Sequence, residues 1–267
     1  MLVMIRNSFI FLDMIQEKTE RSIWQQGIKD WNDFLNSENI SGISKQRKKY
    51  YDRQIMKSIH ALRDKDLAFF TEKFPNSEQW RLFDQLENAC YVDIETSQYY
   101  GDITILGISD GENSKTFVKD YNLDKTIILN TLLKFDGIIT FNGSSFDIPI
   151  IERWLKDSLS TIIHIDLRHL CQKTGLTGGL KEIERCMGVK RNDDIKDLDT
   201  LTYWNQWQKS KDSDYLEKLI QYNKADVDNM IPLMRYCYKE MIKRYEKYIA
   251  DEKADKKTVQ APYQNIL

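Results

Sequence analysis

The spacing of apolar residues changes near residue 88 and divides the chain into two parts. Before that point apolar side chains recur every three or four positions, which is the period of an α-helix. Residues 8–36 show this period twice, with Gly27 where one helix would end and Asp30 where the next would be capped. We therefore expect two helices joined by a tight turn.

A longer helix is predicted over residues 45–63. Its apolar stripe consists of Tyr51, Ile55, Ile59 and Leu62. Seven basic residues accompany one acid, Asp52, and lie mostly off that stripe: Lys45, Arg47, Lys48, Lys49, Arg53, Lys57 and Arg63. Such a basic face is either simply solvated or placed to guide a nucleic-acid strand.

Strand-like and helix-like segments alternate after residue 88. The predicted strands cover 90–94, 103–108, 116–118, 137–141 and 162–167. The predicted helices cover 124–135, 146–155, 179–187 and 214–248, with a polar, partly helical connection over 190–214. Pro232 is expected to kink the last helix. Three strands in hairpin succession, followed by helices alternating with strands, indicate an α/β fold with a mixed sheet.

These patterns predict three regions. Residues 1–88 would form a small all-helical domain, residues 89–250 an α/β domain, and residues 251–267 a disordered tail, because that last segment is charged and contains few apolar residues.

Composition restricts the class of protein. The 267 residues include 39 Lys and Arg against 41 Asp and Glu, and this near-neutral balance excludes a protein that coats nucleic acid by bulk charge. Four cysteines without a C-x-x-C pair argue against a zinc ribbon and predict buried, reduced thiols. Arg6 and Asp13 interrupt the apolar first residues, and no apolar run is long enough to span a membrane. We therefore expect a soluble, cytoplasmic protein.

Two carboxylates in one predicted strand are the first candidates for chemistry. Asp93 and Glu95 lie two residues apart, so both side chains project from the same face of the strand. Burying two unpaired charges costs several kcal/mol. A basic partner or a metal ion is therefore expected beside them.

Further acids occur at the ends and faces of other predicted elements. Asp147 follows a strand and opens a helix, where a helix-capping role is an equal alternative. Tyr222 and Asp226 are four residues apart and share one face of the last helix. Taken singly, a half-buried tyrosine and a solvated acid would explain them.

Together, these residues match a known family. The motifs are Asp93-Ile94-Glu95-Thr96, Asn142-x-x-x-Phe146-Asp147 and Tyr222-x-x-x-Asp226. Over residues 89–240 the chain resembles the DEDD exonucleases of the ribonuclease-H-like superfamily. Within these it resembles the tyrosine-bearing, DnaQ-like subgroup that includes YprB-like domains and the proofreading domains of family B polymerases.

The resemblance implies a ribonuclease-H-like mixed sheet flanked by helices and a 3′ to 5′ exonuclease that uses two Mg²⁺ or Mn²⁺ ions. By the same resemblance Asp93, Glu95, Asp147 and Asp226 hold the ions, Tyr222 positions the attacking water, and Thr96 and Asn142 contact the terminal nucleotide. The physical chemistry agrees, because four carboxylates balance two divalent cations and oxygen ligands suit Mg²⁺ and Mn²⁺. Strand-end and turn roles explain Thr96 and Asn142 equally well.

Other aromatic and imidazole side chains have structural explanations. Trp204 and Trp207 share a helical spacing and could stack bases, although packing in the core is the favoured role. His164 and His169 are expected to satisfy local hydrogen bonds.

The segment before the α/β domain resembles the helix-hairpin-helix of YprB-like proteins, but Asp13 stands where that hairpin has glycine. The better candidates for guiding nucleic acid are Lys45, Arg47, Lys48, Lys49 and Arg53. The sequence thus favours an exonuclease acting on single-stranded DNA. A 3′ to 5′ exoribonuclease and a catalytically idle nucleic-acid-binding module stay open as alternatives.

Overall fold

One mixed sheet forms the centre of the α/β part. The computed structural model describes residues 4–99, 101–192 and 198–250. Its strands are β1 (Ala89–Thr96), β2 (Ile103–Ser109), β3 (Ser114–Val118), β4 (Gly137–Thr140) and β5 (Ile163–Asp166), in the order β3-β2-β1-β4-β5. The pairs β1–β2 and β2–β3 are antiparallel, whereas β1–β4 and β4–β5 are parallel. The mixed sheet predicted from the sequence is confirmed.

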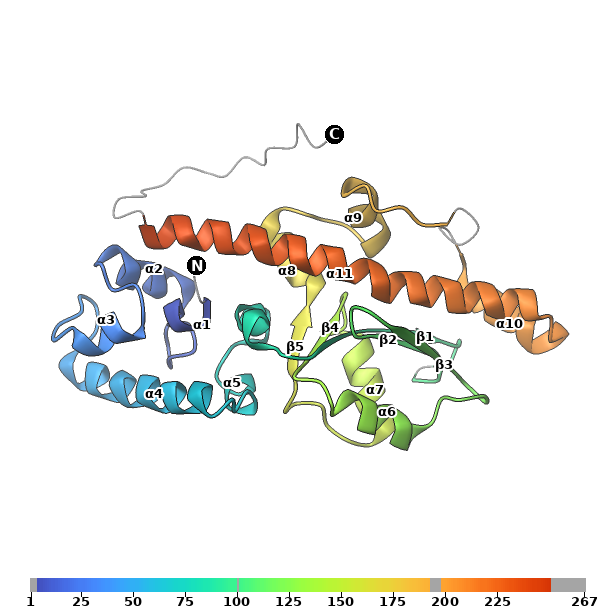
Figure 1. Ribbon diagram of the computed structural model, residues 1–267, viewed down its shortest axis with the longest axis horizontal. Helices are drawn as coiled ribbons and strands as arrows, with labels where there is room; N and C mark the ends of the chain where they lie inside the picture. The colour runs from blue at the N-terminus through green and yellow to red at the C-terminus, as the bar shows by residue number, and fades with distance from the viewer. Residues whose placement is uncertain (1–3, 100, 193–197, 251–267) are drawn as a thin grey trace.

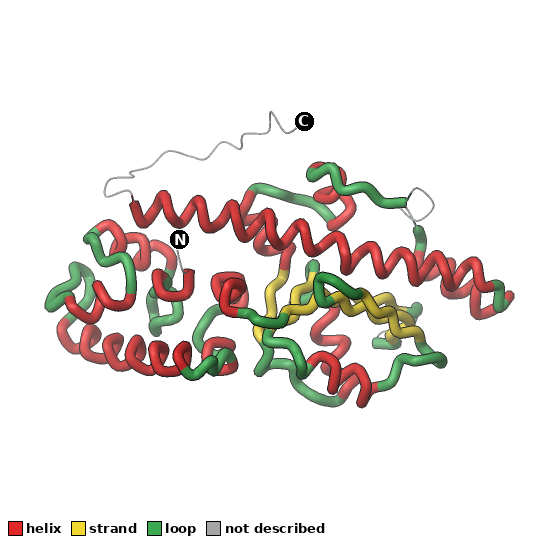
Figure 2. Tube along the Cα trace, viewed as in Figure 1, coloured by secondary structure: helices red, strands yellow, loops and turns green. Residues whose placement is uncertain are grey.

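Helices cover both faces of this sheet (Figures 1 and 2). Helices α6 (Lys125–Leu132) and α7 (Asp147–Leu155) lie on one face, and the long helix α11 (Ser213–Ala250) crosses the other. Two adjacent residues of β2 point to opposite faces of the sheet. Leu106 packs in the cluster with α6 and α7, whereas Ile105 packs with α10 (Thr200–Ser210) and α11. The predicted helices 124–135, 146–155 and 214–248 are therefore present.

The N-terminal part is helical, as predicted. It contains α1 (Met4–Asn7), α2 (Glu17–Gln25), α3 (Trp31–Asn36), α4 (Lys45–Arg63), α5 (Ala68–Thr71) and the 3₁₀ segment η1 (Asn76–Gln85). Gly27 adopts a φ of 82° after α2, and the Asp30 carboxylate caps α3 by accepting from the Asp33 N–H. The two helices expected within residues 8–36 are confirmed.

Helix α11 joins the two parts of the chain. Its residue Tyr245 accepts a hydrogen bond from Arg81, whose guanidinium also forms a two-pronged pair with Glu20 of α2 at 2.9 and 3.0 Å. One hydrophobic cluster continues from the N-terminal helices to β4, β5 and α11. The domain boundary at residue 88 stays a prediction, and the core is continuous across it.

Several details differ from the sequence predictions. Helix α8 (Leu167–Thr174) was not predicted, because it follows β5 without an intervening turn and is capped by Asp166. Helix α11 includes Pro232 without interruption, and its ribbon shows no sharp bend in Figure 1, whereas a kink at Pro232 was expected. Cys186 is exposed, whereas the other three cysteines are buried as predicted. The predicted tail, 251–267, lies outside the described residues.

The sequence predicted that no apolar run is long enough to span a membrane, and the helices can be compared with this prediction. Among those in residues 4–99, 101–192 and 198–250, none combines the length and apolar character that crossing a bilayer requires.

Candidate active site

Three carboxylates from two elements meet between the sheet and α11. Asp93 and Glu95 project from the same face of β1, and Asp226 faces them from α11. One oxygen atom from each of the three lies within 4.8 Å of the other two. The structure therefore brings together three of the four carboxylates predicted from the sequence as metal ligands.

A glycine on the neighbouring strand lets α11 approach this closely. Gly107 of β2 pairs directly with Asp93, and a Cβ atom at Gly107 would lie only 2.2 Å from the Asn223 side-chain oxygen. Asn223 is fully buried, and its amide donates to the Asp93 carboxylate at 2.9 Å and to the Asp93 carbonyl at 3.2 Å. Asn223, which we did not predict, thus orients Asp93. The sequence signal was a glycine inside an otherwise apolar strand, which marks close approach of another element.

Asp147 lies beside this cluster and has a different contact. It is the first residue of α7, is buried, and accepts a hydrogen bond from the Ile94 N–H of β1 at 3.1 Å. Phe146 occupies the N-cap position of α7, and the carboxylate of Asp147, one residue later, bonds across to the central strand. Its charge reaches the cluster, since Asp147 contributes to raising the pKa of both Asp93 and Glu95.

Burial and mutual repulsion raise the pKa of every carboxyl group in the site. Burial is the main cause, and it raises the pKa of Glu95 to about 8, of Asp147 to about 7 and of Asp226 to about 6. The pKa of Asp93 is raised well above its usual value by burial and by the charges of Asp226, Asp147 and Glu95. A divalent cation would stabilise the ionised forms, and the oxygen-only donor set suits Mg²⁺ or Mn²⁺.

A buried arginine already contacts one of these carboxylates. Arg191 donates to Asp226 and also pairs with Glu184 of α9 (Leu180–Cys186), with an Nη2–Oε1 distance of 2.7 Å. The attraction of Arg191 opposes the effect of burial on the pKa of Asp226. The sequence predicted a basic partner or a metal ion beside the two carboxylates of the first strand. It gave no sign that the basic residue would come from the 190–214 connection.

The cluster opens into a cleft of ≈ 450 Å³. Tyr222 lines it, and two cations lie over its ring, the Lys181 ammonium 4.7 Å and the Arg191 guanidinium 5.4 Å from the ring centroid. Burial and the nearby carboxylates raise the pKa of Tyr222 above its ordinary value, so the hydroxyl keeps its proton. Lys181, a further residue that we did not assign to the site, places a positive charge at the cleft.

Thr96 and Asn142 are positioned at strand ends. Thr96 ends β1, next to an irregularity that follows Glu95. Asn142 has a φ of 66°, its N–H donates to Asp166 at 2.8 Å, and its side-chain oxygen accepts from Arg168 at 2.7 Å. The contacts hold the Asn142 turn in shape, and substrate contact by either residue stays a prediction.

The basic residues of α4 lie away from the carboxylates, because α4 is at the left end of the molecule in Figure 1, whereas β1 lies in the right half. Lys48 is buried, with its ammonium 2.6 Å from Asp52 and over the ring of Phe34. Lys48 therefore does not belong to the exposed basic set that the sequence predicted. The reason is tertiary, since packing of α3 against α4 covers it.

Core roles are confirmed for the tryptophans. Trp204 and Trp207 are buried and pack against each other with ring centroids 4.7 Å apart. His164 is partly buried with Nε2 2.8 Å from the Thr140 hydroxyl, and desolvation lowers its pKa to about 4.

Comparison with known proteins identifies the α/β part. A family model described as the RNase_H superfamily matches residues 90–238, more than half of the chain. Among solved structures, a family B DNA polymerase from the hyperthermophilic archaeon Pyrobaculum calidifontis is similar, with a TM-score of 0.41 and 14% sequence identity. The match covers 66% of this chain and 31% of the polymerase chain, so this chain spans about a third of that protein. No curated protein matches the chain.

Proposed function

We propose that this chain, which belongs to the RNase_H superfamily, is a divalent-metal-dependent nuclease that removes nucleotides from the 3′ end of single-stranded DNA. One observation carries the proposal. Asp93, Glu95 and Asp226 bring carboxylate oxygens within 4.8 Å of one another in an open cleft, with Tyr222 beside them. The family match supports a nuclease-type function, and the direction and substrate are our inference.

The donor set fits Mg²⁺ or Mn²⁺. Asp93, Glu95 and Asp226 would hold the ions directly, and Asp147, whose charge acts on Asp93, would contribute a fourth carboxylate. When bound, the ions would polarise the phosphodiester and lower the pKa of a water molecule. The three mutually repelling carboxylates, of which Asp226 is buried and the other two are partly buried, would at the same time gain the positive charge that compensates them.

The protein's own groups have separate parts in this scheme. Asn223 fixes the orientation of Asp93 through its amide, so the carboxylate is held before substrate arrives. Tyr222 retains its proton and would orient the attacking water by a hydrogen bond rather than act as the base. Lys181 would attract the phosphate of the terminal nucleotide into the cleft.

A catalytically idle nucleic-acid-binding module is the second candidate. Arg191 favours it, because its guanidinium already gives Asp226 a buried positive partner. In such a protein the arginine would replace the metal, and nucleic acid would bind without being cut.

A labelled-strand assay separates these functions. Single-stranded DNA, duplex DNA and RNA of one sequence, labelled at the 5′ end, would be incubated with Mg²⁺, Mn²⁺ or EDTA. The enzymes would be the wild type, Asp93→Ala and the control Asp228→Asn, whose carboxylate contacts Ser114 and Lys224 instead of the cluster. We expect a ladder that shortens from the 3′ end of single-stranded DNA and disappears in EDTA and in Asp93→Ala.

Other outcomes assign the alternatives. Faster shortening of RNA would identify an exoribonuclease. Cutting of a circular single strand would contradict an exonuclease, since a circle has no end. Binding without metal-dependent cleavage of any substrate would identify the idle module.

A further inference from the structure

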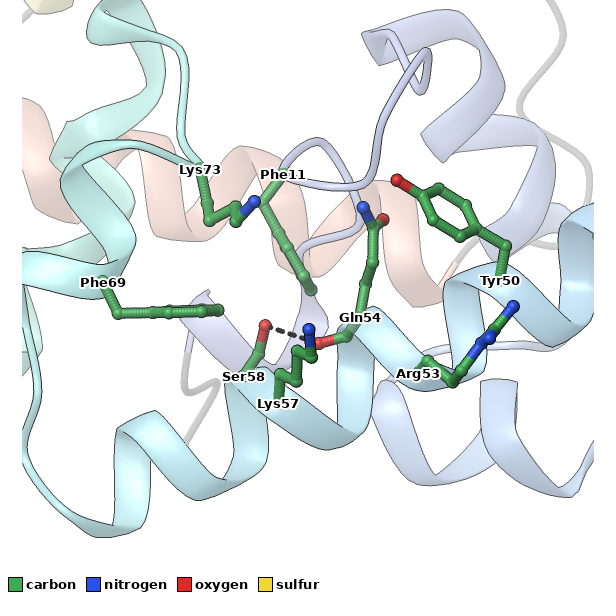
Figure 3. Close-up of a pocket in the computed structure, with 8 residues that line it drawn as sticks. All are labelled: Phe11, Tyr50, Arg53, Gln54, Lys57, Ser58, Phe69 and Lys73. Carbon is green, nitrogen blue, oxygen red and sulfur yellow. Dashed lines mark hydrogen bonds between the residues drawn. The ribbon is translucent and has the colours of Figure 1, made fainter.

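A second hollow, of ≈ 290 Å³, lies in the helical part between α4, α5 and the N-terminal segment (Figure 3). Its lining includes the basic residues Arg53, Lys57 and Lys73 and the aromatic residues Phe11, Tyr50 and Phe69. None of these belongs to the carboxylate cleft. A volume of this size is at the lower end of the range for small-molecule sites, which suits one nucleotide unit.

The hollow has an excess of positive charge. Within the part of the chain that the structure describes, no carboxylate lies within 4 Å of the charged groups of Arg53, Lys57 or Lys73. The nearby acid, Asp13, is engaged by the Tyr50 hydroxyl and by the Gln54 amide at 2.8 Å. These hydrogen bonds hold the pKa of Asp13 below its usual value, so Asp13 stays ionised. Its single negative charge does not balance the three positive charges that line the hollow. An anionic ligand is therefore favoured.

An aromatic ring accompanies these cations. In Figure 3 the ring of Phe69 extends toward Ser58 and Lys57, and the Lys73 ammonium lies 6.0 Å from its centroid. Phe11 is buried and closes the hollow on the side of the N-terminal segment. Cations beside a partly exposed ring suit a phosphate joined to a base, because the base can stack while the phosphate is neutralised.

A row of basic residues leads along α4 into this hollow. Lys45, Lys49, Arg53 and Lys57 are all exposed and follow one another at intervals of four residues. Four helical residues advance by about 6 Å, which is close to the separation of successive phosphates in an extended single strand. Four positive charges at this spacing suit the successive phosphates of a nucleic-acid strand better than the phosphate of a single free nucleotide.

We propose that this row and hollow form a docking site for single-stranded nucleic acid. The phosphates lie along Lys45, Lys49, Arg53 and Lys57, and one base enters the hollow against Phe69. This docking site rests on the proposed nuclease function in one respect, namely that the docked strand is the strand to be cleaved.

Binding measured without turnover tests the site. A fluorescently labelled 20-nucleotide oligothymidine would be titrated in EDTA, over a series of salt concentrations, with wild type, Arg53→Ala/Lys57→Ala and Phe69→Leu. Lys239→Ala/Lys247→Ala is the matched control, since both lysines are exposed on α11. We expect about tenfold weaker binding for Phe69→Leu. For Arg53→Ala/Lys57→Ala we expect at least about tenfold weaker binding and a logarithmic salt slope smaller by about 1.4. The control should bind as wild type.

Three results would overturn the docking site. They are wild-type affinity in both hollow variants, thymidine monophosphate binding as tightly as the 20-mer, or equal competition by an acidic peptide. Cleavage of a small chromogenic nucleotide ester with Mn²⁺ reports on the carboxylates alone and should be unchanged in the hollow variants. If the wild type cleaves nothing while binding still depends on Arg53, Lys57 and Phe69, the proposed activity fails and the docking site stands.

Discussion

Arg191 and Asp226 form a buried ion pair at the edge of the carboxylate cluster. The same guanidinium holds Glu184, so it joins α9 to α11 through two acids. Asp226 is also one of the three residues whose oxygens converge. The Arg191 guanidinium and a divalent metal ion would therefore compete for the Asp226 carboxylate.

Arg191→Ala is expected to destabilise the protein in EDTA and to tighten its binding of metal. Losing the guanidinium leaves Glu184 and Asp226 buried without their partner, which costs about 3 kcal/mol. Because Asp226 is then free to bind an ion, we expect the Mn²⁺ dissociation constant to fall about tenfold, or about 1.4 kcal/mol. Denaturant unfolding and calorimetric titration measure the two effects. Arg235→Ala, an exposed α11 position, serves as control, and an unchanged Mn²⁺ affinity in Arg191→Ala would refute the competition.

Asp93→Asn is expected to abolish cleavage without harming the fold. The change removes one anion from a group of repelling carboxylates and keeps the size of the side chain. We expect a loss of at least about 1,000-fold in rate, since several kcal/mol of metal-derived stabilisation disappear. The thermal midpoint in EDTA should be no lower than that of wild type. Activity near the wild-type level would contradict the assigned site.

Stability without metal is expected to fall as the pH rises. Folding raises the pKa of Asp226, Asp147 and Glu95 to about 6, 7 and 8, so the folded state binds protons more tightly than the unfolded chain. These groups therefore stabilise the fold fully below about pH 4, and this contribution is lost by about pH 8. Thermal unfolding in EDTA at pH 5.5 and 8 measures it.

Mg²⁺ at pH 8 should recover part of that loss, because the ion compensates the ionised carboxylates. Glu95→Gln should make the dependence on pH shallower, and Asp228→Asn should leave it unchanged. Greater stability at pH 8 than at pH 5.5 in EDTA would show that the carboxylates do not carry these shifts.

Gly107→Ala is expected to disturb the site from the neighbouring strand. The new methyl group would lie 2.2 Å from the Asn223 oxygen, so α11 or the Asn223 side chain has to move. We expect a loss of about 2 kcal/mol in the free energy of unfolding and reduced cleavage. In an Asn223→Ala background the same change should cost less, and a double-mutant cycle measures the difference. Additive effects would mean that the two residues do not collide.

Tyr222→Phe is expected to slow cleavage and to leave folding and metal binding intact. The ring keeps its contacts with Lys181 and Arg191, and only the hydroxyl is lost. A rate about tenfold lower would correspond to one hydrogen bond to water. The pH profiles of the two proteins should run parallel, because the hydroxyl stays protonated. A profile that loses a titration step in the variant would instead indicate that Tyr222 acts as a base.

Relationships within single elements were determined by the sequence. Two residues along a strand or four along a helix necessarily share a face, so Asp93 with Glu95, and Tyr222 with Asp226, followed from spacing alone. The mixed sheet followed in the same way from the order of short apolar runs and helical segments.

Contacts between distant parts of the chain were decided only by the tertiary structure. Arg191 reaches Asp226 across 35 positions, and the Asp147 carboxylate meets the Ile94 N–H across 53. The ring of Phe34 covers Lys48, although its basic neighbours on α4 are exposed. Local periodicity sets the direction of a side chain from its own backbone, but its partner depends on how closely the elements pack. At Gly107 the distance between β2 and α11 is short because glycine has no side chain to separate them.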